Sequence, residues 1–405
     1  MSNGEVLATA DIVVVGAGIV GLCTAWELKQ RGFGVLVVDQ RFPAYGASGR
    51  NPGALWVQTR RTGTELSLAR AGKKKYQEYR DTLGDVFDLR TDGGLFFFET
   101  DEQAEVMAGY VKDRRASGVE LELIGRAEAA KLSPILPGTA IGAVFSPEDA
   151  QIDPQQFLSA LEAACTRAKV RIFRNTAVLS ALRDGDRVVG VRSVRGEIHA
   201  SGVVWATGAW ASALPTEGVP SALSTVRIGQ LMMQPVESAS SPVLHGPRGV
   251  HGCGALTDLP QFAPEAFATP LASAEGDARG FFNDTAMLNQ GGSLYIGHSI
   301  DGHGSLNPHI SLAATQVMAK VGAERYPQYA EFGVTGLWAG LGSETPDQLP
   351  IVGPADGAYV NVGHDWGISS GPACGQVLAE IIAGEHTPYA KALRADRAAL
   401  RTPRD

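Results

Sequence analysis

Three glycines near the start of the chain have the spacing that phosphate-binding turns require. Gly16, Gly18 and Gly21 stand in the segment DIVVVGAGIVGLCTAWELKQRGFGVLVVD, directly after the apolar run 12–15. The first glycine permits a tight turn, the second lets the backbone approach a pyrophosphate, and the third lets a helix pack closely on a strand. Asp39 follows at the place where a carboxylate accepts hydrogen bonds from ribose hydroxyls. The pattern predicts a pocket for an adenine dinucleotide.

Two strands and a helix must position these glycines. The β-branched run before Gly16 is typical of a buried parallel strand. Apolar residues recur at helical spacing over 19–31, so we expect a helix whose N-terminus directs amide groups and a positive dipole end at the phosphates. A second apolar run over 35–38 leads to Asp39. Strand, turn, helix, second strand and acid therefore occur in the order that a dinucleotide pocket needs.

The composition is that of an ordinary globular protein. The chain has 405 residues, of which 44% are hydrophobic, and a formal net charge of −8. It has no lysine- or arginine-rich block, so we expect no nucleic acid as partner. No apolar run reaches the length of a membrane span, and the first ten residues lack the basic and apolar regions of a secretion signal, which favours a cytoplasmic location.

The cysteines argue against a disulfide framework and against a metal site. Cys23, Cys165, Cys253 and Cys374 lie far apart and form no CxxC pair. This spacing is typical of reduced, buried thiols. We therefore expect no metal.

The rest of the chain alternates helices and strands and then changes character. We expect a long polar helix over 65–82 and a second helix that begins at Pro154. From about 224 to 333 short strands alternate with many turns, which indicates a mixed or antiparallel sheet. Near the end, 363–375 predicts a glycine-rich turn and 376–383 an amphipathic helix.

Four motifs occur in a fixed order along nearly the whole chain. They are VVVGAGIVGL with Asp39, the loop GASGRNPG, VVWATGAWA over 203–211, and TPDQLPIVGP followed by YVNVGHDWGISSGP. In this order and spacing they resemble the flavin-dependent amine oxidoreductases of the D-amino-acid oxidase, glycine oxidase and sarcosine oxidase superfamily. The resemblance implies FAD, whereas composition alone does not distinguish FAD from NAD. Some relatives attach the flavin to a cysteine near TPD; no cysteine lies between Cys253 and Cys374, so we expect non-covalent FAD.

The resemblance also assigns the cofactor-binding positions. It implies that the first motif binds the pyrophosphate, Asp39 the adenosine ribose, Val178 the adenine side and the terminal block the flavin ring. The implied cofactor-binding residues are Gly16, Ala17, Gly18, Ile19, Gly21, Asp39, Gln40, Ala47, Ser48, Gly49, Arg50, Asn51, Gly53, Val178, Thr207, Gly208, Trp210, Gly363, Trp366, Gly367 and Ile368.

The expected fold class is α/β, with a Rossmann-like FAD-binding domain of the glutathione-reductase type and a second, mixed β-sheet substrate domain. The FAD-binding domain is expected to be discontinuous. We assign to it residues 8–90, 141–223 and 336–390. Residues 91–140 and 224–335 are assigned to the substrate domain, and 391–405 to a C-terminal tail.

The sequence departs from the family at the position that binds a substrate carboxylate. Many relatives have an arginine just before TPD, where two parallel N–H donors hold the carboxylate, but this chain reads GLGSETPD, with Gly342 there. Arg50, Arg60, Arg61 or Arg227 could replace that arginine, or the substrate has no carboxylate at this place. An arginine in a loop is more often a surface charge, which is the interpretation favoured for Arg60 and Arg61. Glu344, beside Gly342, could instead bind a cationic substrate.

Two further residues are candidates for direct contact with the flavin or the substrate. Sarcosine-oxidase-like relatives have a lysine that helps the flavin react with oxygen, and the best match here is Tyr295 in SLYIG. His364 stands in the turn that resembles the flavin contact. With Arg50, Gly342 and Glu344 they make up the candidate catalytic pocket.

The resemblance implies an FAD-dependent oxidoreductase that oxidises a C–N bond of a primary or secondary amine or modified amino acid. In the family, a hydride passes from the carbon beside the nitrogen to flavin N5, and water hydrolyses the imine. Oxygen or an electron-transfer partner would be the acceptor, and the chain could form a homo- or hetero-oligomer. Two alternatives stay open: a flavin dehydrogenase of a C–OH substrate, and a flavin-binding subunit of a larger electron-transfer complex.

Overall fold

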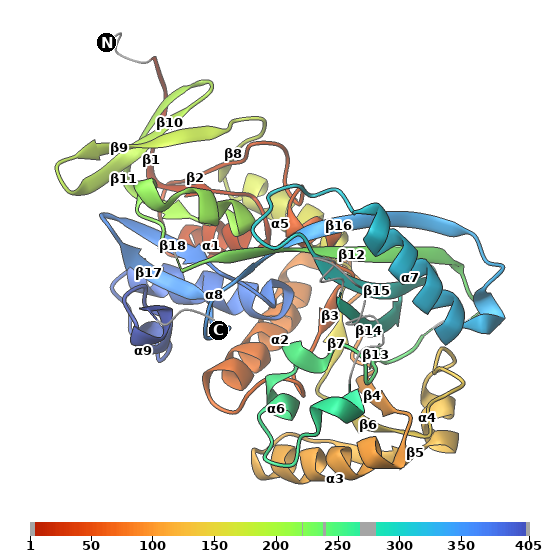
Figure 1. The fold of residues 1–405 in the computed structure, drawn as a ribbon. Helices are drawn as coiled ribbons and strands as arrows, with labels where there is room; N and C mark the ends of the chain where they lie inside the picture. The colour runs from red at the N-terminus through yellow and green to blue at the C-terminus, as the bar shows by residue number, and fades with distance from the viewer. Residues whose placement is uncertain (1–4, 221, 238–239, 268–280, 402–405) are drawn as a thin grey trace.

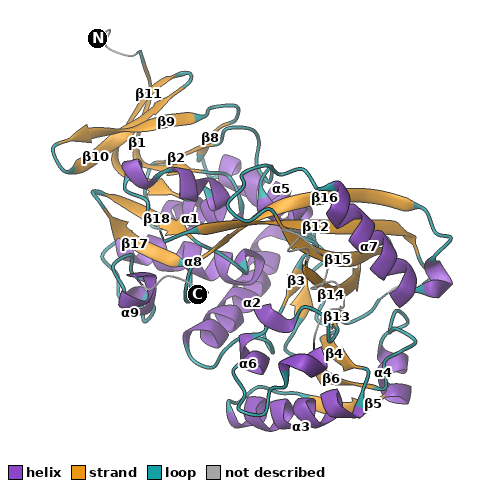
Figure 2. Cartoon of the chain, viewed as in Figure 1, coloured by secondary structure: helices purple, strands orange, loops and turns teal. Residues whose placement is uncertain are grey.

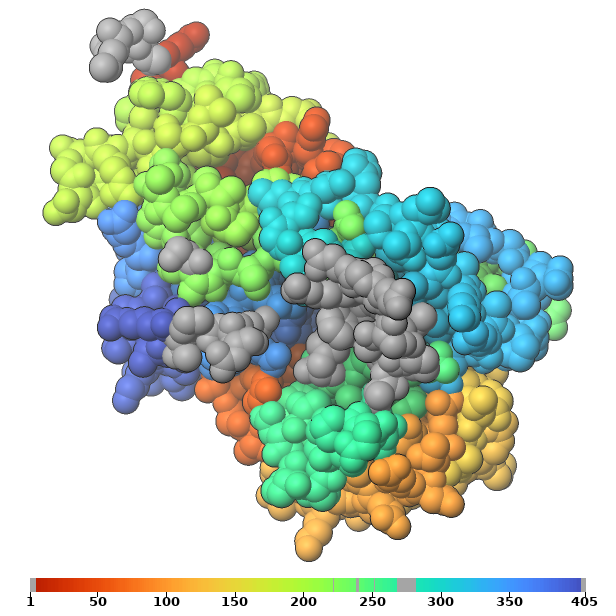
Figure 3. All heavy atoms as spheres, viewed as in Figure 1, coloured from red at the N-terminus to blue at the C-terminus, as the bar shows by residue number. Residues whose placement is uncertain are grey.

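The computed structural model describes residues 5–220, 222–237, 240–267 and 281–401 (Figure 1). Parts of the expected substrate domain, 268–280, and of the expected tail, 402–405, lie outside the described residues. The described chain forms two eight-stranded sheets and a short two-stranded sheet that pairs β3 (Ala54–Leu55) with β7 (Ala150–Gln151). In the space-filling view the strands β9 and β10 and the helix α3 lie at opposite ends of an elongated molecule (Figure 3).

The first sheet contains the glycine motif. Its strands are β1 (Val6–Val15), β2 (Val35–Val38), β8 (Arg171–Phe173), β9 (Val178–Asp184), β10 (Arg187–Ser193), β11 (Gly196–Trp205), β17 (Ile351–Ala355) and β18 (Ala358–Val362). The strand order is β17-β18-β11-β1-β2-β8, and β1 pairs in parallel with β2 and β11. The residues at the ends of β1, β2 and β11 are buried, as continuous apolar runs of parallel strands require.

Four helices pack beside this sheet: α1 (Ile19–Gln30), α2 (Thr64–Leu83), α5 (Pro154–Arg167) and α8 (Gly367–Ile382). Helix α1 contacts both α5 and α8, and α8 also contacts α2; Figure 2 shows α1 beside α8. Asp153 caps α5 by accepting hydrogen bonds from the backbone N–H groups of Gln155 and Gln156. These helices hold the largest hydrophobic core against one face of the sheet.

The second sheet is mixed, as expected. Its strands are β4 (Gly94–Phe98), β5 (Glu122–Gly125), β6 (Gly142–Ser146), β12 (Ser224–Pro235), β13 (Val243–His245), β14 (Phe281–Leu288), β15 (Ser293–Asp301) and β16 (Val334–Glu344). The order is β16-β12-β15-β14-β13-β4-β6-β5, antiparallel except where β13 meets β4.

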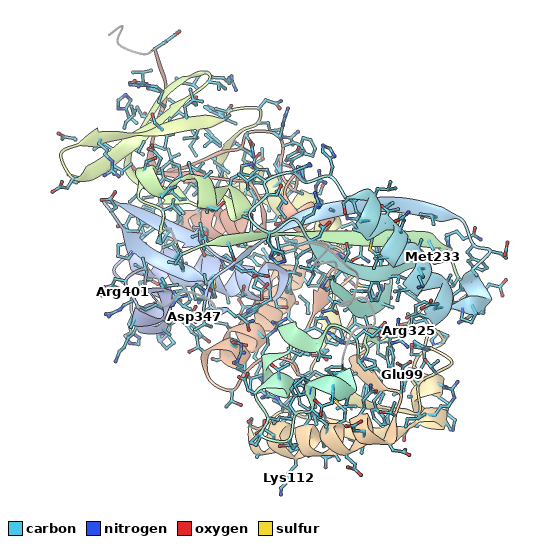
Figure 4. All side chains as sticks on the ribbon, in the orientation of Figure 1. Glu99, Lys112, Met233, Arg325, Asp347 and Arg401 are labelled. Carbon is cyan, nitrogen blue, oxygen red and sulfur yellow. The ribbon has the colours of Figure 1, made fainter. Side chains whose placement is uncertain are left out.

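Helices and turns complete the second half of the molecule. They are α3 (Asp101–Ala116), α4 (Arg126–Leu132), α6 (Gly254–Thr257), α7 (Leu312–Arg325) and, near the end of the chain, α9 (Ala390–Leu393), with short 3-10 turns between. Helix α7 packs on β15 and β12. Its last residue, Arg325, is buried and forms ion pairs with Glu99 and Asp284, which tie the helix to the sheet (Figure 4).

Two strands lie in the second sheet although the expected ranges place most of their residues in the FAD-binding domain. They are β6, within the range 141–223, and β16, most of which falls within 336–390. Sheet pairing corrects these two assignments because both strands form their hydrogen bonds with β4, β5 or β12. The division into two domains itself stays a prediction.

We expected the glycine-rich segment 363–375 to form a turn, but most of it is helical. Helix α8 begins at Gly367 and continues to Ile382, so the expected helix over 376–383 is only its second half. A Cβ at Gly375 would lie 2.8 Å from the Cβ of Cys23 in α1. This glycine therefore lets two helices approach closely.

Helix α8 also accommodates a proline. Pro372 has no N–H to donate to the carbonyl of Ile368, four residues earlier. The hydroxyl of Tyr76, from α2, donates a hydrogen bond of 2.7 Å to that carbonyl instead. Tertiary packing thus supplies the hydrogen bond that the helix loses.

Candidate active site

A cavity of about 530 Å³ extends from the glycine motif to the second sheet. It opens at the carboxyl ends of β1, β2 and β11, where Val15, Val38 and Trp205 line it, and it reaches β12, β14, β15 and β16. Sixteen of the expected cofactor-binding residues line it: Gly16, Gly18, Ile19, Asp39, Gln40, Ala47, Ser48, Arg50, Asn51, Val178, Thr207, Gly208, Trp210, Trp366, Gly367 and Ile368. The five candidate catalytic residues also line it: Arg50, Tyr295, Gly342, Glu344 and His364.

Five of the expected cofactor-binding residues lie behind this wall: Ala17, Gly21, Gly49, Gly53 and Gly363. A Cβ at Gly21 would lie 1.9 Å from the carbonyl oxygen of Gly16, and one at Gly53 would lie 1.9 Å from that of Ile152. These glycines shape the backbone that forms the wall. We assign Gly21 and Gly53 a packing role, and the contacts of the five residues with the cofactor stay a prediction.

The glycine motif has the geometry that the sequence analysis expected. Gly16 has a φ of +111°, and a Cβ there would lie 2.3 Å from the carbonyl oxygen of Ala206 in the neighbouring turn. Helix α1 begins at Ile19 next to this turn, and its first turn contains no acidic side chain. The backbone N–H of Ile19 donates a hydrogen bond of 3.0 Å to the Ser48 hydroxyl. The positive helix terminus therefore faces the cavity.

Asp39 lies at the end of β2 with its carboxylate held in place. Its two oxygens accept hydrogen bonds of 2.8 Å from the backbone N–H groups of Ala17 and Arg41. Burial raises the pKa of Asp39, and these hydrogen bonds oppose that rise. A carboxylate so oriented at the cavity wall fits a ribose.

Two buried polar atoms of the same wall have no hydrogen-bond partner within the described part of the chain. They are the indole Nε1 of Trp205 and the hydroxyl Oγ1 of Thr207. Because a buried polar group without a partner costs free energy, such atoms indicate where a bound molecule supplies one. The residues present therefore fit FAD, the cofactor implied by the resemblance.

Arg50 connects the loop after β2 to the second sheet. Its Nε donates to the carbonyl of Tyr45 at 3.0 Å, and its Nη1 donates to the carbonyl of Ala339 in β16 at 2.8 Å. The carbonyl of Arg50 accepts a hydrogen bond of 2.8 Å from the indole N–H of Trp338. Arg50 therefore positions the loop, and these contacts occupy two of its guanidinium nitrogens.

His364 is half-buried, and both of its ring nitrogens are engaged. Nε2 lies 2.9 Å from Oδ1 of Asn361, and Nδ1 lies 3.0 Å from the hydroxyl of Ser370. Burial lowers the pKa of His364 to about 3. The amide of Asn361 donates to Thr24 and to the carbonyl of Cys374, so its oxygen is the acceptor and we assign the proton to Nε2. The neutral imidazole in this network orients the turn before α8, and its role in catalysis stays a prediction.

The remaining candidates lie on the second sheet. The Tyr295 ring packs edge-on against Trp338, with ring centroids 6.0 Å apart, and burial raises the pKa of its hydroxyl. A Cβ at Gly342 would lie 3.0 Å from Cγ2 of Val226. The space beside this glycine is therefore filled by an apolar side chain.

The structure also brings to the cavity residues that sequence reasoning left aside. Arg60, favoured above as a surface charge, is half-buried: its guanidinium carbon lies 4.8 Å from the centroid of the Trp366 ring, and the residue lines the cavity. Asn283 lines the cavity with Oδ1 unpartnered in the described structure, and nothing in the strand pattern around it singles it out. A Cys253 thiol 3.4 Å from Nε2 of His245 completes this end of the cavity.

Among the described residues, no group of three or more His, Cys, Asp or Glu side chains could hold a metal ion. A search of the same residues for a helix long and apolar enough to cross a membrane finds none.

Comparisons with known proteins agree with this geometry. A family model described as FAD dependent oxidoreductase (DAO) matches residues 11–381. A glycine oxidase from Pseudomonas aeruginosa is 28% identical over 95% of this chain and 99% of its own length. The crystal structure of glycine oxidase from Geobacillus kaustophilus superposes with a TM-score of 0.80 at 20% identity, over 96% of this chain and 99% of that chain. The crystal structure of L-proline dehydrogenase from P. horikoshii superposes with a TM-score of 0.78 at 21% identity, over 96% of this chain and 97% of that chain. The likeness confirms the expected fold class.

Proposed function

Since the chain belongs to the DAO family of FAD-dependent oxidoreductases, we propose that its cavity binds FAD non-covalently and a small amine or amino acid beside it. The family match makes FAD the cofactor and oxidation of a C–N bond the reaction. FAD supplies the two-electron acceptor, and water hydrolyses the imine that the substrate becomes.

One observation carries the substrate side of this proposal. The cavity wall contains, on the second sheet, two buried polar atoms without a partner in the described structure: Oδ1 of Asn283 and Oγ of Ser343. The amide nitrogen of Asn283 donates 2.9 Å to the carbonyl of Gly249, which fixes the orientation of the side chain. Its oxygen is then an acceptor for a substrate N–H.

The protein groups have positioning roles in this reaction. Apolar side chains of the second sheet, among them Val226, Ile228 and Met287, line the cavity and exclude water from the substrate. The neutral ring of His364 fixes the turn that precedes α8. Orientation of the C–H bond next to the nitrogen is what this chain must supply, because the cofactor carries the redox chemistry.

Anaerobic mixing of the FAD-loaded protein with a panel of primary amines, secondary amines and amino acids tests the function. We expect flavin absorbance to bleach with at least one amine and ammonia or an alkylamine to be released. A matched panel of alcohols and 2-hydroxy acids should leave the absorbance unchanged. Bleaching by the alcohols alone, or by neither panel, contradicts the proposal.

Two electron acceptors fit the proposal: oxygen and an electron-transfer partner. Oxygen uptake during turnover distinguishes them, and size-exclusion chromatography of the same sample shows whether the chain works alone or as a homo- or hetero-oligomer. We further propose a cytoplasmic location, which the four free, buried cysteines support.

A further inference from the structure

Arg60 is a half-buried cation of the cavity wall that forms no ion pair with the described residues. Its guanidinium stacks on the ring of Trp366, and both residues line the cavity. Nε makes one long hydrogen bond, 3.4 Å, to the carbonyl of Trp56. Within the described ranges no carboxylate lies within 4.0 Å of its nitrogens. Stacking leaves the edge of a guanidinium, with its parallel donors, available to an anion.

Of the other arginines named as substitutes for the missing clamp, Arg50 donates Nε and Nη1 to backbone carbonyls, and the other two are held in ion pairs. Arg61 pairs with Glu65 and Asp258, and it also donates to Gln348. Arg227 forms a two-point ion pair with Asp301, both N–O distances being 2.7 Å, and it does not line the cavity. Ion pairs of this kind satisfy the donors that a substrate carboxylate would need.

The β16 position itself cannot receive an anion. Gly342 pairs with Val226 of β12, and a Cβ there would lie 3.0 Å from Cγ2 of Val226 and 3.1 Å from Cδ1 of Ile228. These branched side chains close the place from which an arginine would extend. Val226 and Ile228 therefore make the cavity wall beside Gly342 apolar, and Arg60 lies at another part of this wall.

The segment around Arg60 joins the polar end of the cavity. The backbone N–H of Ala255 donates 3.3 Å to the carbonyl of Thr59, and the side chain of Arg61 covers Gly254. The 249–258 segment thus packs on the loop of Arg60, and its Gly249 carbonyl holds Asn283. The acceptor oxygen of Asn283 and the guanidinium of Arg60 belong to the same end of the site.

We propose that Arg60 is a substrate-binding residue that holds an anionic group, such as a carboxylate, of the amine substrate. That the bound molecule is an amine rests on the proposed function. That Arg60 binds an anionic group does not depend on it. The substrate class is then an amino acid or N-substituted amino acid, bound by an arginine of the loop after β3 in place of one on β16. An amine without a negative charge would leave the half-buried cation of Arg60 without a counter-charge from the substrate.

Titration of the FAD-loaded protein with benzoate, followed by the change in flavin absorbance, tests the anion site. The variants are Arg60→Gln and Arg60→Lys, the neutral probe is benzamide, and Arg174→Gln, an exposed arginine paired with Glu162, is the control. We expect the Kd of benzoate to rise at least tenfold in Arg60→Gln and less in Arg60→Lys, because lysine keeps the positive charge but lacks the two parallel N–H donors of a guanidinium. Benzamide binding and FAD content should not change.

Three results overturn the proposal: benzoate that does not bind the wild-type protein, a Kd that is the same in Arg60→Gln, or an equal loss of benzoate and benzamide binding. The last would show that Arg60 only packs on Trp366. Benzoate binding needs no turnover, so the anion site is tested even if no amine bleaches the flavin. Among the amines that do bleach the flavin, those without an anionic group should have a KM at least tenfold above that of a matched amino acid. The Arg60→Gln variant should remove this difference.

Discussion

Oδ2 of Asp149 accepts a hydrogen bond of 2.6 Å from Nε2 of Gln58, and both side chains are fully buried. Oδ1 of the same carboxylate accepts hydrogen bonds of 2.6 and 3.0 Å from the backbone N–H groups of Val57 and Gln58. Val57 and Gln58 lie between β3 and Arg60, whereas Asp149 directly precedes β7. One buried carboxylate therefore fixes the turn that carries the unpaired guanidinium into the cavity.

Replacement of Asp149 by alanine should destabilise the protein. The variant leaves the backbone N–H groups of Val57 and Gln58 without this acceptor, and the Gln58 amide keeps only its 3.4 Å hydrogen bond to the carbonyl of Gly94. We expect a loss of about 2–4 kcal/mol of unfolding free energy. Asp149→Asn keeps an acceptor for the backbone N–H groups. If the Gln58 amide flips, its Oε1, which has no partner in the described structure, accepts from the new Asn amide, so this variant should lose less unfolding free energy. Urea unfolding measures both. A loss no larger than that of Asp85→Ala, at an exposed site, contradicts the assignment.

Asp149 should also make stability depend on pH. Burial raises its pKa from 3.8 to about 6, and the hydrogen bonds from Gln58 and Val57 and the charge of Lys73 oppose the rise. The folded state then holds the proton more tightly than the unfolded state, so stability falls as pH rises from about 4 to 6. The unfolding free energy of wild type minus that of Asp149→Asn should decrease over this range. A difference that is constant or increases with pH refutes the prediction.

The first strand, turn and helix could be predicted because their determinants are local. Gly16, Gly18 and Gly21 lie within six residues of one another, and the apolar periods on either side set strand and helix directly. The start of α8 could not be predicted in this way. Gly375 packs against Cys23 of α1, and the carbonyl of Ile368, which Pro372 leaves free, accepts from Tyr76, so residues distant in sequence decide that the segment is a helix.

The same distinction applies to the site. The cofactor positions follow from motifs, whereas Arg60 enters the cavity because its loop meets Trp366, which is about 300 residues away along the chain. A loop arginine has no sequence signal for burial. The relation between Gly342 and Val226 depends on the pairing of β12 with β16, which a single sequence does not give.

Gly21 provides a test of the packing role assigned to the third motif glycine. A Cβ in Gly21→Ala would lie 1.9 Å from the carbonyl oxygen of Gly16, so α1 must move away from β1. We expect a loss of about 1–3 kcal/mol in unfolding free energy and a lower FAD content per chain. Gly138→Ala is the matched control, because no atom lies within 4 Å of its added Cβ. Equal flavin absorbance and equal Tm in both variants would exclude the packing role.

Asp39 should determine how tightly the dinucleotide is held. Asp39→Ala removes an acceptor for ribose hydroxyls and also frees the N–H groups of Ala17 and Arg41, which the carboxylate now orders. A hydrogen bond to a charged group contributes about 1.5–3 kcal/mol, so the Kd for FAD should rise by at least about tenfold. Asp39→Asn keeps one acceptor oxygen, so its Kd for FAD should lie between those of the wild type and Asp39→Ala. Fluorescence titration of apoprotein with FAD measures the series, with Asp186→Ala, at an exposed turn, as control. If Asp39→Ala binds FAD as tightly as this control does, the carboxylate orders its own loop and does not contact the ribose.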